Sequence, residues 1–103
     1  MTAYFVVNYD VSDVEQYAKY NPGSNHITAV TVAKHGGEII VATNKGVSLA
    51  GSAAQMRVII QFPSKEDAQA WDDDPEYAQA KAIRLASTTN IDAYIVDKLT
   101  IPE

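Results

Sequence analysis

The densest group of acidic side chains in the chain is the segment WDDDPEY at residues 71–77. Adjacent carboxylates of this kind can hold a divalent cation or carry protons during catalysis. A calcium or magnesium site, however, needs oxygens that converge from several directions, and neighbouring aspartates on a turn usually point apart. Pro75 suits the first position of a helix, which makes Asp74 the expected N-cap and places Glu76 in the first turn. The segment therefore predicts a helix boundary and no metal site.

The two histidines, His26 and His35, could supply acid-base or metal chemistry. Neither lies at the spacing of paired metal ligands on a helix. His35 precedes Gly36 and Gly37, where a helix is expected to end, so we interpret it as a residue that stabilises the helix terminus. His26 follows the NPG sequence at residues 21–23. A break in a helix can aim a side chain at a ligand, although an exposed histidine is the simpler interpretation.

Tyr77 and Arg84 are separated by a spacing that places both on one face of a helix. An arginine that faces a cleft can hold a carboxylate with two parallel hydrogen bonds, whereas its ordinary role is a salt bridge to a neighbouring acid. Aromatic residues such as Tyr20 can line an apolar pocket or fill the interface between helices and sheet. We predict a ligand-binding site at the mouth of a cleft between two helices and the sheet, with these members: Tyr20, His26, Tyr77 and Arg84.

Changes in the spacing of apolar residues along the chain indicate the helices and strands that position these residues. Residues 3–11 are rich in aromatic and β-branched side chains and predict a strand. Residues 14–20 place apolar side chains at helical spacing, and the NPG sequence interrupts this pattern. The helix is expected to resume near Ser24 and to continue to His35.

Three more strands are expected at residues 38–43, 57–62 and 91–99. Ser64 and Asp67 resemble a capping box at the start of a second helix, which has a joint within the aspartate segment. The order of elements is β-α-β-β-α-β. This order predicts an α+β, ferredoxin-like fold, in which an antiparallel four-stranded sheet carries both helices on one face.

Composition limits the classes of function. A chain of 103 residues that is 47% hydrophobic can bury one core, so we expect a single domain spanning residues 1–103. Lys and Arg number 8 and Asp and Glu 13, which gives a net charge of −5 and argues against nucleic acid and anionic membranes as partners. The absence of cysteine excludes disulfides and thiolate chemistry. With no secretory leader and no long apolar run, we expect a cytoplasmic protein. Because 103 residues leave no room for a separate cofactor domain, we expect no cofactor.

Four segments together resemble one known family. They are AYFVVNYDVSDVEQYAKY at residues 3–20, KHGGE at 34–38, QFPSKEDAQAWDDDPEYAQAKAIR at 61–84 and IDAYIVD at 91–97. The chain is similar over nearly its whole length to the small bacterial family called domain of unknown function 1330. That family belongs to the dimeric α/β-barrel superfamily of ferredoxin-like folds, so the resemblance implies this fold and a dimer.

The chain departs from the usual pattern of that family in three places. Gln61 stands where members often have Glu before Phe-Pro-Ser, and Ala50 stands where a Glu often precedes Gly. The first helix also looks about one turn longer around NPGS. Any role of a family carboxylate at positions 50 and 61 therefore does not carry over to this chain.

The strand sequences independently predict a homodimer. Within residues 57–62, Ile59 belongs to one face and Ile60 to the other, and Val6 and Val7 alternate in the same way in the first strand. Two helices can cover only one side of such a sheet, and a large exposed apolar face is rare on a monomer. We expect a second copy to pack against the open face and form a dimeric α/β barrel.

Three classes of function remain open. The first is a module that binds a small apolar or carboxylated metabolite in a cleft between helices and sheet. The second is a cofactor-free enzyme, an isomerase or monooxygenase of the kind that other dimeric α/β-barrel families contain, with Tyr or His as acid or base. The third is a structural or interaction protein. Because one fold supports many activities, the choice depends on the site, and we rank the binding module first.

Overall fold

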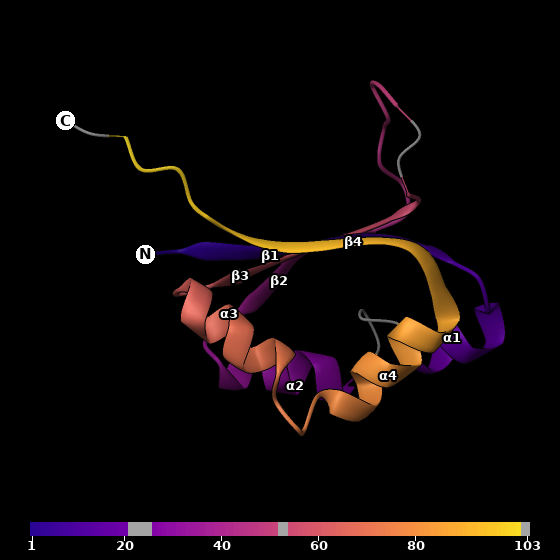
Figure 1. Ribbon diagram of the computed structural model, residues 1–103, viewed down its shortest axis with the longest axis horizontal. Helices are drawn as coiled ribbons and strands as arrows, with labels where there is room; N and C mark the ends of the chain where they lie inside the picture. The colour runs from indigo at the N-terminus through magenta and orange to yellow at the C-terminus, as the bar shows by residue number, and fades with distance from the viewer. Residues whose placement is uncertain (21–25, 52–53, 102–103) are drawn as a thin grey trace.

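Four strands form one antiparallel sheet in the computed structural model, which describes residues 1–20, 26–51 and 54–101 (Figure 1). The strands are β1 (Ala3–Val11), β2 (Glu38–Thr43), β3 (Met56–Phe62) and β4 (Thr88–Asp97). Their order in the sheet is β2-β3-β1-β4, so β1 pairs with both β3 and β4. The antiparallel four-stranded sheet predicted from the sequence is confirmed.

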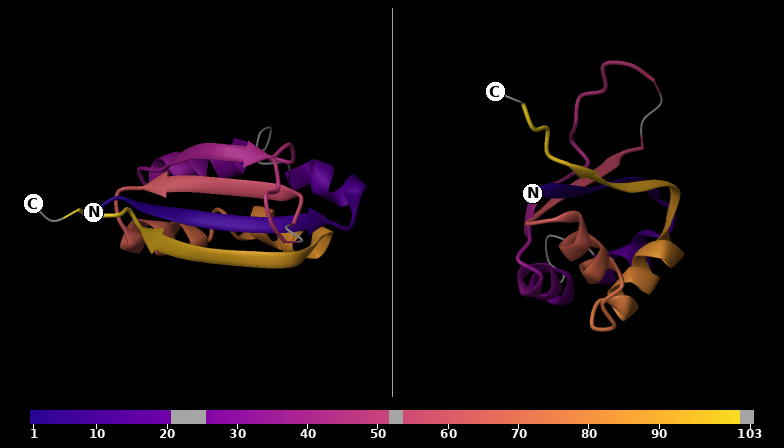
Figure 2. Two further views of the ribbon diagram at one scale, coloured as in Figure 1. Left: turned by 90° about the horizontal axis from the view of Figure 1, so that it is seen from above. Right: turned by 60° about the vertical axis from the view of Figure 1, so that its left-hand side comes forward.

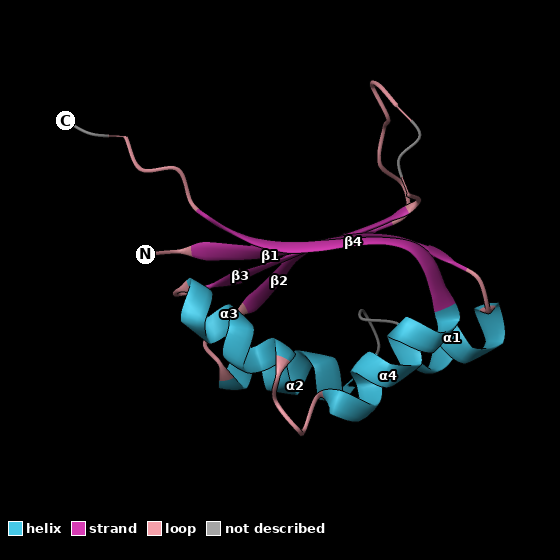
Figure 3. Cartoon of the chain, in the orientation of Figure 1, coloured by secondary structure: helices cyan, strands magenta, loops and turns pink. Residues whose placement is uncertain are grey.

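The helices of the described chain all lie on one face of this sheet (Figures 2 and 3). They are α1 (Val14–Tyr20), α2 (His26–Lys34), α3 (Lys65–Asp72) and α4 (Ala78–Ser87). Each helix of the predicted β-α-β-β-α-β order is thus represented by two pieces, one on either side of a proline-containing segment. The order of elements and the placement of the helices on a single face are confirmed.

Alternation along the strands produces the core between sheet and helices. Phe5, Val7 and Tyr9 of β1 are at most 5% exposed, and their neighbours on β3 include Val58 and Ile60. These side chains point toward the helices because successive strand residues project to opposite faces. The core is therefore a continuous layer under the helices.

Trp71 of α3 is the largest side chain in this layer and is 1% exposed. Its ring stacks on Tyr77, with the ring centroids 4.2 Å apart, and is nearly perpendicular to the ring of Phe5, with the centroids 5.2 Å apart. Phe62 is tilted against the same ring at 5.7 Å. Aromatic contacts of this geometry add to the stabilisation from burial, so Trp71 connects α3 to the sheet and to the start of α4.

β4 begins at Thr88, three residues before the start predicted from the sequence. The segment Thr88-Thr89-Asn90 is polar and lacks the apolar alternation that identifies strands. Its pairing with β1 is irregular, with a shift in register between Asn8 and Asp10, and Asn90 has a positive φ of 55°. Asn tolerates this conformation better than most residues. The irregular start of the strand is therefore built from polar residues, which pattern analysis does not recognise as a strand.

No helix of the described chain covers the opposite face of the sheet (Figure 1). Tyr4 and Val6 of β1 lie on this face, and their cross-strand neighbours on β4 are Val96 and Tyr94. Tyr94 is 50% exposed and Val96 43% exposed. On the other side of β1, Val6 pairs with Ile59 of β3. We call these five residues the open sheet face.

Candidate functional site

A buried cluster of three tyrosines and one arginine lies where β1, α1 and α4 meet. Tyr9 is the last inward-facing residue of β1, and its hydroxyl lies 2.6 Å from that of Tyr17 on α1. Tyr77, just before α4, and Tyr9 are both fully buried, and Arg84 of α4 is 3% exposed. Arg84 is close enough to affect the ionisation of both Tyr9 and Tyr17. We call these four residues the tyrosine–arginine cluster.

Burial keeps the phenols of Tyr9 and Tyr17 protonated. Burial raises the pKa of Tyr9 far above its usual value of 10.0, and the hydrogen bond with Tyr17 raises it further. The positive charge of Arg84 acts in the opposite direction on the pKa of Tyr9, but the effect of burial is larger. Burial likewise raises the pKa of Tyr17. Both hydroxyls are therefore neutral near pH 7 and act as hydrogen-bonding groups.

A pocket of about 490 Å³ opens beside this cluster, between α3, α4 and β4. The strands and α4 give it a mainly apolar wall, formed by Phe5, Leu85, Ile91, Ala93, Tyr94 and Ile95. The helices also give it a polar side, formed by Gln69, Asp72, Lys81 and Arg84. Pockets that bind small molecules commonly combine apolar walls with a few polar groups of this kind.

Two cations belong to the polar side of this pocket. Lys81 forms an ion pair with Asp72, with Nζ 3.0 Å from Oδ2, and also donates to the Asp72 carbonyl at 3.3 Å. Arg84 lies one helical turn further along α4. A guanidinium and an ammonium at the end of an apolar pocket can together bind a carboxylate.

Part of the cleft predicted between the two helices and the sheet lies within the described residues. A pocket of about 220 Å³ between α1, α2 and α4 is lined by Lys19, Ile27, Glu76, Gln79, Ala80 and Ile83. Tyr77 and Arg84 are absent from that lining, and Arg84 lines the larger pocket at β4 instead. The side chains of Tyr20 and His26 lie outside the described residues. Their meeting with Tyr77 and Arg84 stays a prediction.

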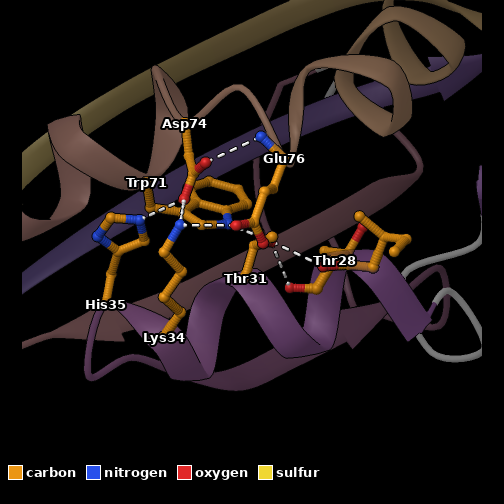
Figure 4. A network of polar contacts seen from close by, with 8 residues as sticks. Thr28, Thr31, Lys34, His35, Trp71, Asp74 and Glu76 are labelled. Carbon is orange, nitrogen blue, oxygen red and sulfur yellow. Dashed lines mark hydrogen bonds and ion pairs between the residues drawn. The ribbon is translucent and has the colours of Figure 1, made fainter.

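Asp74 is the centre of a polar network that connects α2 to the segment between α3 and α4 (Figure 4). Its Oδ2 lies 2.7 Å from Nε2 of His35 and 2.9 Å from Nζ of Lys34. Its Oδ1 accepts a hydrogen bond of 2.9 Å from the backbone N–H of Glu76. The hydrogen bond from His35, with those from Lys34 and the Glu76 N–H, holds the pKa of Asp74 well below its usual range.

The prediction that Asp74 is the N-cap of the following helix is wrong. α4 begins at Ala78, and its N-cap is Tyr77, which makes no capping hydrogen bond through its side chain. The carboxylate of Asp74 instead stabilises the turn that contains Pro75, because it accepts from the N–H two residues later. The interpretation of the acidic segment as structural is retained, with His35 as an unforeseen partner of Asp74.

Within residues 1–20, 26–51 and 54–101, no group of three or more His, Asp or Glu side chains is placed to hold a metal ion. In the same part of the chain, no helix is long and apolar enough to span a membrane.

The sequence matches one family model from residue 2 to residue 99, that of the Domain of unknown function (DUF1330). The chain belongs to the DUF1330 family. This confirms the resemblance drawn from the segments of the sequence. No curated protein matches the DUF1330 chain.

Solved structures share the fold of this DUF1330 chain at low identity. The RPA0582 protein of unknown function from Rhodopseudomonas palustris is 17% identical, with a TM-score of 0.72 over 97% of this chain and 84% of that one. A dimeric protein of unknown function and ferredoxin-like fold from Bacteroides fragilis is 14% identical, with a TM-score of 0.61 over 94% and 96%. A dimeric ferredoxin-like protein of unknown function from Thermobifida fusca is 12% identical, with a TM-score of 0.59 over 95% and 92%. The ferredoxin-like α+β fold class is confirmed.

The site predicted from the sequence did not include Tyr9 and Tyr17. Tyr9 continues the inward alternation of Phe5 and Val7, which placed it under the helices, but nothing in the sequence paired its hydroxyl with Tyr17. The pocket at β4 was missed because its walls come from four separate elements. Arg84 was identified from its position on the second helix, and it does line a pocket.

Proposed function

We propose that this protein binds a small molecule with an apolar body and a carboxylate in the pocket between α3, α4 and β4. The observation that carries the proposal is the composition of that pocket, in which Lys81 and Arg84 line the same space as a mainly apolar set of side chains. Its volume of about 490 Å³ lies within the range typical of small-ligand sites. The carboxylate would replace Asp72 as the partner of Lys81, and the guanidinium of Arg84 would give a second contact.

Titration calorimetry with benzoate and phenylacetate, each compared with its neutral amide, tests this proposal. We expect the acids to bind and the amides to bind at least about tenfold more weakly, because only the acids pair with the cations. Lys81→Gln should weaken the acids by about tenfold and leave the amides unchanged. Lys65→Gln is the matched control, since Lys65 is also a surface partner of an aspartate, Asp97, and does not line the pocket. Equal affinity for acids and amides would contradict the proposal.

A cofactor-free enzyme is the second candidate, and the tyrosine–arginine cluster favours it. Neutral phenols beside a buried cation can donate hydrogen bonds to a carbonyl oxygen and stabilise the negative charge that develops on it. Tyr17 also lines a separate pocket of about 400 Å³, together with Thr43, Asn44, Lys45 and Met56. Under this alternative, Tyr17→Phe abolishes turnover of an enolisable substrate while the fold is retained.

We further propose that this single domain of residues 1–103 forms a homodimer in the cytoplasm. The open sheet face supports the dimer, because apolar side chains on three strands lie there without a covering helix. The descriptions of the Bacteroides fragilis and Thermobifida fusca proteins as dimeric support it as well. Sedimentation at micromolar concentration should give about twice the chain mass of 11.2 kDa, and a clean monomer would contradict the proposal.

A further inference from the structure

The four most exposed aliphatic side chains of the described residues lie on two segments without regular structure. Leu49 is 94% and Val47 is 85% exposed, in the connection from β2 to β3. Leu99 is 79% and Ile101 is 77% exposed, in the chain that follows β4. We call residues 44–51 the loop arm and residues 98–101 the tail arm. Scattered exposed apolar residues are ordinary, but two segments that each present a pair of them are unusual.

Both arms leave the sheet on the side that the helices do not cover. Figure 1 shows them rising from opposite ends of the sheet, and the right-hand view of Figure 2 shows the same arrangement from another direction. Together they flank the open sheet face, which carries Tyr94 and Val96. Exposed apolar side chains are therefore found on both arms and on the sheet face that they flank.

The bases of the arms are fixed to the sheet by hydrogen bonds. The N–H of Lys98 donates to the carbonyl of Thr2 at 2.8 Å, where the tail arm begins. The N–H of Gln55, at the return of the loop to β3, donates to Oδ1 of Asp10 at 2.8 Å. Asn90 also donates to the carboxylate of Asp10, at 3.2 Å. Anchored bases set the places from which both arms depart, which reduces the entropy lost when the arms dock.

The chain exposes more surface than a folded monomer of its mass is expected to expose, which favours a partner that covers part of it. A folded monomer of 11.2 kDa is expected to expose about 5,700 Å². This chain exposes 6470 Å², roughly 800 Å² more than that expectation. About 800 Å² per partner is also what a stable protein interface of standard size buries. A second copy that covers the open sheet face and the arms would bring the exposed area back to the ordinary range.

We propose that the loop arm and the tail arm are dimerisation elements, whose side chains Val47, Leu49, Leu99 and Ile101 pack against a second copy of this chain. The inference rests on the homodimer proposed above and names the segments that stabilise it. The second copy is the occupant because a two-fold axis presents the same open face and the same two arms to each partner, so one surface is sufficient for both. With a net charge of −5 on each copy, apolar contact must supply the attraction.

Sedimentation equilibrium of matched variants tests the role of the arms. The test variant is Val47→Asp, which changes the loop arm. Val14→Asp is its control, because Val14 is also highly exposed, at 75%, but belongs to α1 on the side of the sheet that the helices cover. Each substitution occurs twice in a symmetric dimer, so we expect Val47→Asp to raise the dissociation constant of the dimer by about a hundredfold or more. Val14→Asp should leave it within about twofold of the wild type. Leu99→Asp should behave like Val47→Asp.

The outcomes separate this inference from the homodimer itself. If Val47→Asp and Leu99→Asp leave the dissociation constant unchanged while Val96→Asp on the open sheet face raises it, the dimer stands and the role of the arms is overturned. If the wild type sediments as a monomer at every concentration, both the proposed homodimer and the proposed role of the arms are wrong.

A chemical measurement gives an independent reading, because the chain contains no cysteine. We expect the single thiol of Leu49→Cys to react with iodoacetamide about tenfold more slowly in the dimer than after dilution to the monomer. The thiol of Val14→Cys should react at one rate in both. Equal rates for Leu49→Cys in dimer and monomer would overturn the proposal.

Discussion

The hydroxyl of Tyr9 lies inside the protein, 2.6 Å from the hydroxyl of Tyr17, and this burial makes the fold sensitive to alkaline pH. The pKa of Tyr9 is raised in the folded state, so the folded chain keeps this proton when the unfolded chain releases it. Stability is therefore complete below a pH of about 10, the usual pKa of tyrosine, and falls as the pH rises above that value.

Tyr9→Phe removes this dependence. At neutral pH the variant should lose about 1 kcal/mol of unfolding free energy, because the hydrogen bond with Tyr17 is gone. Between about pH 9 and about pH 11 it should lose less stability than the wild type, since it has no buried phenol to ionise. Urea unfolding followed by circular dichroism measures both effects. A loss above pH 10 that is equally steep in the two proteins would show that Tyr9 is not its source.

Asp74 gives the opposite dependence at acid pH. Hydrogen bonds from His35, Lys34 and the N–H of Glu76 lower its pKa in the folded state. Its contribution to stability is therefore present above about pH 4, the usual pKa of aspartate, and is lost as the pH falls below that value.

Asp74→Asn should be less stable than the wild type at neutral pH and should lose less stability between about pH 5 and about pH 2. Asp73→Asn is the control, because the neighbouring Asp73 is exposed. Thermal unfolding across this range separates them. If both variants follow the wild-type curve, the network around Asp74 does not stabilise the fold.

At the scale of the elements, Gly37 allows the start of β2 to lie close to the end of β3, because it has no side chain. A Cβ atom at this position would lie 2.7 Å from Cε1 of Phe62 and 3.0 Å from the carbonyl oxygen of Gln61. Phe62 is 1% exposed, so its ring cannot move without disturbing the core. Any side chain at position 37 therefore separates the two strands or displaces the ring.

Gly37→Ala should accordingly destabilise the protein by about 1–3 kcal/mol, the usual cost of overpacking. Gly46→Ala is the control, because its Cβ would lie 3.6 Å from the nearest atom, the Arg57 Nε, which is an ordinary contact. Urea unfolding at neutral pH provides the comparison. An equal and small effect of the two substitutions would contradict the close approach of Gly37 to Phe62.

The strands were predictable because their patterns are local. β1, β2 and β3 alternate or are continuously apolar, and their predicted bounds agree with the structure to within one residue. β4 was predicted to start late because Thr88 and Asn90 carry no apolar signal. The boundary at Asp74 was misplaced because the carboxylate has partners on α2, and no local pattern shows contacts with residues 40 positions away.

The candidate site was less predictable than the fold, for the same reason. Arg84 and Tyr77 were predicted to share a helical face from their spacing, and the structure places Arg84 on α4 and Tyr77 at its N-cap. The pairing of Tyr9 with Tyr17, and the pocket that Arg84 shares with Ile91 and Ile95, depend on how separate elements pack. Such contacts are fixed by tertiary structure, which a single sequence does not reveal.

At the scale of the whole molecule, the helices of the described chain cover one face of the sheet and leave the other face uncovered (Figure 1). The pocket at β4 lies close to the boundary between these two sides, because Tyr94 both lines the pocket and belongs to the open sheet face. A second copy that covers Tyr94 would therefore also border the mouth of the pocket. Ligand affinity should consequently increase with the fraction of dimer, and Val96→Asp should lower both.

A crystal structure of the protein soaked with phenylacetate tests the central claim, the carboxylate-binding pocket, most directly. We predict electron density for the ligand between α3, α4 and β4, with its ring against Ile91 and Ile95 and its carboxylate within hydrogen-bonding distance of Lys81 or Arg84. A pocket that stays without ligand at saturating phenylacetate, or is filled by the protein's own side chains, would contradict the account.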